Sequence, residues 1–110
     1  MSDTPFLLRG HSRKDLESIR KYIIKKWGKP QWVKYKEILR KRMQALANNP
    51  ALGVSIDEVS KEGYRFPDGR HVFYYLKRES DVVFVGFLAN NLAPEKHLER
   101  IKNMDSELNF

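Results

Sequence analysis

Residues 63–89 read GYRFPDGRHVFYYLKRESDVVFVGFLA. Two turn signals, Pro67-Asp68-Gly69 and residues 78–81, divide this stretch into three runs rich in β-branched and aromatic residues. The pattern predicts strands at 63–66, 70–77 and 82–89, joined as an antiparallel meander. The last run is almost wholly apolar, which is typical of a central, buried strand.

Two helices are predicted on the N-terminal side of this meander. Ser12 as N-cap, with Asp15 three residues later, favours a helix over 13–27. Gly28 ends it, and Pro30 suits the first turn of a second helix that runs to residue 48. The apolar stripes of the two helices are Leu16, Ile19, Ile23 and Trp27, and Trp32, Tyr35, Leu39, Met43 and Leu46. The short linker indicates an αα-hairpin with these stripes facing each other.

The remaining segments are shorter. We expect a strand over 4–9, and a polar connector over 51–62 after Asn48-Asn49-Pro50. A last helix over 94–102 opens at Pro94 and turns Leu98 and Ile101 inward. Residues 103–110 form a tail that is loose unless it docks. The fold class is therefore α+β, with a small antiparallel-rich β-sheet packed against an N-terminal αα-hairpin and a short C-terminal helix.

The composition favours one ordinary folded domain over residues 1–110. The chain has 41% hydrophobic and 32% charged residues, and 110 residues are too few for two separate cores. Its net charge of +7 is uneven. Residues 1–50 contain 13 Lys and Arg against 4 Asp and Glu, a balance of +9, and residues 51–110 contain 8 against 10, a balance of −2. Such asymmetry indicates an acidic partner, either nucleic acid or protein.

Several classes of chemistry find no support in the sequence. The absence of cysteine excludes thiolate catalysis and disulfides, which agrees with the reducing cytoplasm. Residues 1–20 lack a long apolar run, so we expect neither a signal peptide nor a membrane span. No glycine-rich phosphate loop is present, and His11, His71 and His97 lack metal-ligand spacing. We therefore predict no metal and no cofactor.

The predicted hairpin of residues 63–78 gathers polar side chains that could serve an enzyme. They are Arg65, Arg70, His71, Tyr74, Tyr75, Lys77 and Arg78, which include candidate acids, bases and phosphate-stabilising cations. Side chains alternate along a strand, so at most half of this set can share one face. The competing interpretation is that the aromatic residues fill the core and the cations are solvated.

Three strings carry a family resemblance. They are Asp15-Leu16-Glu17-Ser18-Ile19 before Tyr22-Ile23, then LANNPALG at 46–53, then GYRFPDGRHVFYY at 63–75. In order and spacing the chain resembles, over about residues 5–102, the ParE toxins of the RelE/ParE toxin-antitoxin superfamily. The resemblance implies a compact antiparallel sheet against a helical hairpin, and a ParD-like antitoxin that neutralises the protein. It also implies a cytoplasmic bacterial toxin that causes growth arrest.

The two branches of that superfamily imply different targets. ParE-type members poison DNA gyrase and block replication, whereas RelE-type members cut messenger RNA on the ribosome. RelE-like enzymes carry an arginine at the end of the last strand and a tyrosine in the final helix. Here residues 82–89 are uncharged and residues 90–110 contain no tyrosine. The sequence therefore favours gyrase inhibition by binding, with the ribosome-dependent endoribonuclease as the alternative.

One stretch departs from the family pattern. Many ParE-like chains end the last strand with Leu-His and continue toward a Met-Asp step, but residues 88–94 here read LANNLAP. This departure predicts a weakened toxin or one with a shifted target.

The resemblance leads to the following residue assignments. For target binding we predict Arg65, Arg70, His71, His97 and Arg100, and for antitoxin binding Arg20, Lys21, Lys34 and Arg42. A ribonuclease would instead use Arg65, Arg70, His71 and Arg78. The chain could act as a homodimer or as a hetero-oligomer with its antitoxin. A plain basic nucleic-acid-binding domain is the third possibility, and it predicts salt-dependent DNA affinity without growth arrest.

Overall fold

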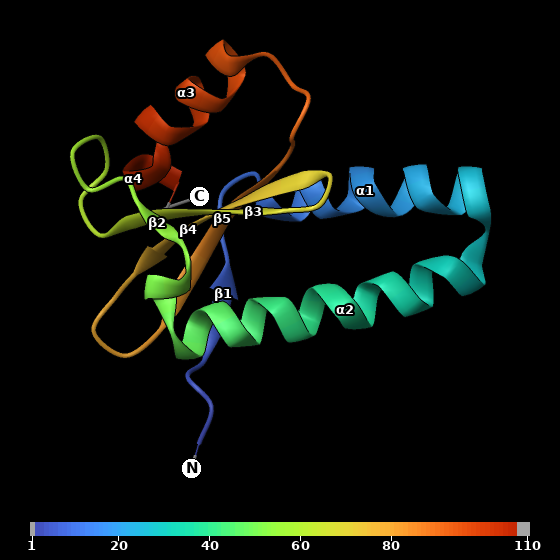
Figure 1. Ribbon diagram of the computed structural model, residues 1–110, viewed down its shortest axis with the longest axis horizontal. Helices are drawn as coiled ribbons and strands as arrows, with labels where there is room; N and C mark the ends of the chain where they lie inside the picture. The colour runs from blue at the N-terminus through green and yellow to red at the C-terminus, as the bar shows by residue number, and fades with distance from the viewer. Residues whose placement is uncertain (1, 108–110) are drawn as a thin grey trace.

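The computed structural model describes residues 2–107, and it confirms the predicted α+β class. The order of elements is β1 (Phe6–Leu8), α1 (Ser12–Trp27), α2 (Lys29–Asn48), the 3-10 turn η1 (Pro50–Leu52), β2 (Val54–Ser55), β3 (Gly63–Asp68), β4 (His71–Lys77), β5 (Val82–Ala89), α3 (Pro94–Lys102) and α4 (Met104–Glu107). Figure 1 shows α2 and α3 on opposite sides of the sheet.

The five strands of the described chain form one mixed sheet in the order β1-β5-β4-β3-β2. The meander β3-β4-β5 is antiparallel, as predicted, and β1 pairs in parallel with β5. Strand β5 is buried along seven of its eight residues because it lies between β1 and β4, which confirms the prediction of a central strand. The sequence analysis missed η1, which begins at Pro50 and enters the connector predicted at 51–62, and the short edge strand β2 within that connector.

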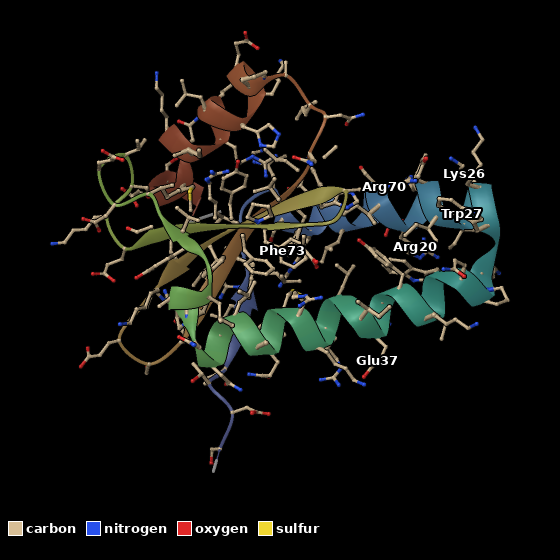
Figure 2. The ribbon with its side chains drawn as sticks, in the orientation of Figure 1. Arg20, Lys26, Trp27, Glu37, Arg70 and Phe73 are labelled. Atoms are coloured by element: carbon tan, nitrogen blue, oxygen red, sulfur yellow. The ribbon has the colours of Figure 1, made fainter. Side chains whose placement is uncertain are left out.

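The face of the sheet toward α1 and α2 holds the larger apolar core. Leu39, Met43 and Leu46 of α2 pack there with Ile19 of α1 and with Phe73 of β4. Figure 2 shows Phe73 between the sheet and α2, and Glu37 on the outer side of α2. The predicted stripe of α2 is confirmed, because its members are buried or half-buried.

Trp27 departs from the predicted stripe of α1. Its exposed fraction is 50%, although Ile19 and Ile23 of the same stripe are buried. Figure 1 shows the cause, since the far end of the helical hairpin extends beyond the sheet. Gly28 alone connects the two helices, with a φ of 91°. This positive φ suits glycine and lets α2 start at Lys29.

The predicted cap of α1 is wrong. Helix α1 begins at Ser12, and no side chain caps it. The Ser12 hydroxyl donates a hydrogen bond to the Arg9 carbonyl instead, at 2.7 Å. Asp15 does not close a capping box, because its carboxylate accepts a hydrogen bond from the Phe87 N–H of β5, at 3.0 Å.

Strand β3 is longer than predicted. It continues through Pro67 and Asp68, which pair with Val72 and His71 of β4, and β4 begins at His71 instead of Arg70. Proline lacks an N–H donor, and it is tolerated here because β2 pairs only with Tyr64 and Arg65. Beyond them β3 is an edge strand.

The second face of the sheet is covered by α3 and α4. Its core contains Val72, Tyr74 and Leu76 of β4, so the predicted alternation along β4 is confirmed. Helix α3 has the predicted bounds, but Leu98 is 45% exposed and only Ile101 of the predicted pair packs inward. The predicted tail docks through Met104, whose side chain is fully buried. Its last three residues lie outside the described chain.

Candidate functional site

The β3–β4 hairpin separates the predicted target-binding residues onto two faces of the sheet. Arg65 pairs with Tyr74 and shares the face covered by α3. His71 alternates in step with Phe73 and Tyr75 along β4, so its side chain lies on the same face as theirs. This face is covered by α1 and α2. The structure therefore brings Arg65 together with His97 and Arg100, and places Arg70 and His71 elsewhere.

The α3 face carries a relay of two hydrogen bonds. The Nε2 of His97 lies 2.9 Å from the Ala89 carbonyl oxygen, which can only accept. Nε2 is therefore the protonated nitrogen, and Nδ1 accepts a hydrogen bond from the Tyr74 hydroxyl at 2.7 Å. Burial raises the pKa of Tyr74, while the charges of Arg65 and Arg100 oppose that rise. Tyr74 belongs to β4 and is only 2% exposed. The two hydrogen bonds of His97 therefore fix α3 to the sheet.

Arg100 forms an ion pair inside the molecule. Its Nη1 donates to the Asp15 carboxylate at 2.6 Å and to the Val85 carbonyl at 3.1 Å, and Nη2 reaches the same carboxylate at 3.3 Å. Strand β1 ends at Leu8, opposite Phe84. Beyond that point Arg100 and Asp15 take the place of a neighbouring strand, since they bind the Val85 C=O and the Phe87 N–H of β5.

Gly86 makes the room for this ion pair. A Cβ atom at position 86 would lie 2.7 Å from Nη1 of Arg100, closer than side-chain atoms pack. The register of β4 and β5 also shifts here, between Tyr74 and Tyr75. A residue with a Cβ atom at position 86 of β5 would therefore collide with the Arg100 guanidinium group.

Arg70 and His71 lie beside the helical hairpin. The Tyr35 hydroxyl approaches His71 Nδ1 at 3.4 Å. Burial lowers the pKa of His71, and the charge of Arg70 lowers it further, against the opposing charges of Asp68 and Asp15. His71 is consequently favoured in its neutral form.

The four residues of the predicted ribonuclease site do not converge. Arg65 and His71 lie on opposite faces of the sheet. Arg70 precedes β4 and Arg78 follows it, so the length of the strand separates them. Arg78 is also bound to Asp81, with contacts of 2.6 and 2.7 Å. The arrangement provides no cluster of cations around one scissile phosphate.

The predicted antitoxin-binding residues lie at exposed positions of α1 and α2. Arg20 forms a surface ion pair with Glu17 at 2.9 Å. Arg42 binds Asp68 of β3 at 3.2 Å and lies over the Phe66 ring. Lys21 and Lys34 are exposed. All four remain accessible, but the first two already have partners within the chain.

A further cluster was missed by the sequence analysis. Tyr22, Lys26 and Trp27 of α1 meet Arg70 of the β3–β4 turn. The Lys26 ammonium lies 3.2 Å from the Tyr22 hydroxyl and 4.8 Å from the centre of the Trp27 ring. The Arg70 guanidinium lies 5.8 Å from the same centre. Tyr22 and Trp27 are both about half exposed, and their position just before Gly28 was the available signal.

Two cavities adjoin this cluster and share Tyr22, Arg70 and His71. One, of about 840 Å³, lies between α1 and the end of β5, where Ser18, Asn90 and Asn91 line it. The other, of about 380 Å³, lies between α1 and α2, where Ile23, Ile38 and Tyr35 line it. Both cavities have mixed linings, and in the second the apolar part comes from Ile23, Trp27 and Ile38.

Residues 7–91 match the family model described as the ParE toxin of the type II toxin-antitoxin system, parDE. The chain belongs to the ParE toxin family. It is thus the toxin component of a type II toxin-antitoxin pair, and membership implies an antitoxin partner. No curated protein matches the chain.

The family match extends from β1 to the residues just after β5. It includes the β3–β4 hairpin and Asp15, but it ends before α3. His97 and Arg100 of the toxin therefore lie outside the matched segment. The family match therefore does not extend to the residues of α3 that form the relay and the ion pair.

Two further observations concern residues 2–107 of the toxin. In this range no three His, Asp or Glu side chains lie close enough together to bind a metal ion. None of the helices within it combines the length and the hydropathy that a membrane span requires.

Proposed function

We propose that this ParE-family toxin inhibits DNA gyrase by binding it, and that a cognate antitoxin neutralises it by covering the binding surface. One observation carries the choice of binding over RNA cleavage: Arg65 and His71 lie on opposite faces of the sheet, and Arg78 lies at the far end of β4. Phosphodiester cleavage needs cations and an acid–base pair around one phosphate. Inhibition by binding has no such requirement.

The charge of the toxin supports this proposal. Its net charge is +7, and the excess resides in the first half of the chain. A basic surface favours both an acidic antitoxin segment and a nucleic-acid-bound target. Gyrase and its DNA are in the cytoplasm, so the toxin acts there.

The experiment is to induce the toxin in bacteria without its antitoxin. Growth, supercoiling of a reporter plasmid and integrity of messenger RNA are scored together. We expect growth arrest and impaired supercoiling with intact RNA. Purified toxin should also inhibit supercoiling by purified gyrase. Cleaved messenger RNA would favour the ribonuclease, and DNA binding without arrest would favour the plain nucleic-acid-binding domain.

Variants on the two faces of the sheet distinguish which face binds gyrase. Arg65→Gln changes the α3 face, and Arg70→Gln changes the helical-hairpin face. Lys36→Gln, an exposed change on α2, is the matched control with the same loss of charge. We expect at least one of the first two variants to relieve gyrase inhibition while Lys36→Gln does not. Equal activity of all three would remove these arginines from the target surface.

A further inference from the structure

The cluster of Tyr22, Lys26, Trp27 and Arg70 places two cations side by side at the surface. Within the described chain, Lys26 and Arg70 have no carboxylate within ion-pair distance. Both cations lie over the Trp27 ring, at 4.8 and 5.8 Å from its centre. The pKa of the Tyr22 hydroxyl is lowered, first by its hydrogen bond with Lys26 and also by Arg70. Two convergent and unneutralised cations attract an anionic group.

The aromatic rings hold these cations in place. Lys26 lies over both the Tyr22 and Trp27 rings, at 5.5 and 4.8 Å from their centres. The two rings meet edge to face at 6.0 Å. Ring faces attract cations and restrict the motion of their side chains. Figure 2 shows Arg70 at the tip of the β3–β4 hairpin beside α1, whose far end carries Lys26 and Trp27.

An apolar recess adjoins the cations. Ile23, Ile38 and Tyr35 line the cavity of about 380 Å³ between α1 and α2, and Trp27 and Arg70 form part of its wall. Ile38 is 52% exposed. Asp68 also lines this cavity, but Arg42 binds it at 3.2 Å. One opening therefore offers an apolar surface next to two cations that have no carboxylate partner within the described chain.

We infer that this opening is the docking point of a protein segment that is both acidic and apolar. A helix fits best, because side chains three or four residues apart lie on the same face. A large apolar side chain enters the recess, and a carboxylate one turn away binds Lys26, Arg70 and the Tyr22 hydroxyl. This inference rests on the proposed function, in which the partners of the toxin are proteins, and adds the kind of segment that the toxin binds.

Charge and ring geometry select this occupant over two others. A nucleobase could stack on Trp27 only by displacing a cation, because Lys26 and Arg70 already lie over that ring. A second copy of the chain would bring another net charge of +7 to the same place. An acidic peptide meets neither obstacle.

The test uses the full chain and two synthetic probes. The first is a blocked helical peptide with one Leu and one Glu four residues apart, labelled for fluorescence anisotropy. The second is a single-stranded oligothymidylate. The variant Lys26→Gln/Arg70→Gln is compared with Lys25→Gln/Lys36→Gln, which removes the same charge from exposed positions of α1 and α2 outside the cluster. Circular dichroism verifies that each variant folds.

We expect the first variant to weaken peptide binding about tenfold, and the control less than about twofold. Tyr22→Phe should weaken it by a smaller factor, since it removes only the hydroxyl. Replacing the peptide's Glu by Gln, or its Leu by Ala, should weaken binding to the unaltered chain. These measurements need neither gyrase nor cells, so their failure is distinct from failure of the proposed function.

Three results would overturn the inference. The peptide does not bind, or both double variants lose the same affinity, which means that only the general charge matters. Oligothymidylate binds, displaces the peptide and depends on Lys26 and Arg70, which assigns the surface to nucleic acid. Sedimentation shows self-association that the Lys26→Gln/Arg70→Gln variant abolishes, which assigns it to a second copy.

Discussion

The helices on the two faces of the sheet are held by different kinds of contact. On one face, α1 and α2 bury Ile19, Leu39 and Leu46 in a continuous apolar core. On the other, α3 is described throughout and none of its residues is buried. It is held by the ion pair of Arg100 with Asp15 and by the relay through His97. The α3 face also has an apolar core, which includes Val85 and Met104. What differs is the helix: α2 is held by apolar area, whereas α3 is held mainly by directed polar bonds.

The largest effect is expected on the helical-hairpin face. Leu46→Ala removes a side chain that is fully buried in α2, and should lower the free energy of unfolding by about 3 kcal/mol. Leu98→Ala on α3, where the side chain is 45% exposed, should change it by less than about 0.5 kcal/mol. Denaturation in urea measures both. Similar losses for the two variants would contradict the difference between α2 and α3.

The second effect concerns the ion pair beneath α3. Arg100→Met or Asp15→Ala should each cost about 2 kcal/mol, because each removes the partly buried ion pair and one hydrogen bond to the backbone of β5. The double variant should cost less than the sum of the two, and this coupling isolates the pair.

Hydrogen exchange locates this effect. The Phe87 N–H donates to Asp15, so Asp15→Ala should accelerate its exchange more than that of β4 amides inside the sheet. Uniform acceleration across β4 and β5 would mean that the ion pair supports the whole fold instead of one edge of β5.

These expectations mark where sequence reasoning succeeds. Helical spacing identified Leu39, Met43 and Leu46, and strand alternation separated Phe73 from Tyr74. Both patterns are local, because each depends only on the spacing of neighbouring residues within one helix or strand. The apolar run of β5 likewise predicted its central place without knowledge of its neighbours.

The failures involve contacts between distant segments. Asp15 and Arg100 are 85 residues apart, so the local pattern assigned Asp15 to a helix cap. Arg65 and Arg70 were grouped in one site, but the observed register, with Arg65 opposite Tyr74, places Arg65 on the α3 face. Trp27 has the spacing of a core residue, and only the extent of the sheet shows that it lies beyond the apolar core.

A smaller effect compares two neighbouring tyrosines of β4. The Tyr75 hydroxyl donates to the Pro50 carbonyl at 2.8 Å, and the Tyr74 hydroxyl donates to His97. Tyr74→Phe and Tyr75→Phe should each cost about 1 kcal/mol near neutral pH, because each removes one hydrogen bond.

At alkaline pH the two tyrosines should differ. Burial raises the pKa of Tyr75 to about 12 from 10.0, so the unfolded chain loses that proton first. Stability from Tyr75 is complete below pH 10.0 and declines as the pH rises toward about 12. Tyr75→Phe should flatten this decline more than Tyr74→Phe, where Arg65 and Arg100 oppose the rise in pKa. Equal flattening would contradict the expected difference.

The smallest effect is a loss of stability at acidic pH that depends on His71. Burial and then Arg70 hold the pKa of His71 below its usual 6.5. As the pH falls through 6.5, the unfolded chain binds a proton that the folded chain resists, so stability declines from that point downward. His71→Gln should make the decline shallower. Arg70→Gln should do so by a different route, because it removes the repulsion and lets the folded imidazole accept the proton. An NMR titration of the imidazole distinguishes the two routes: in Arg70→Gln the His71 resonance shifts at a higher pH than in the parent chain. An unchanged midpoint would show that burial alone sets this pKa and that Arg70 is too well solvated to contribute.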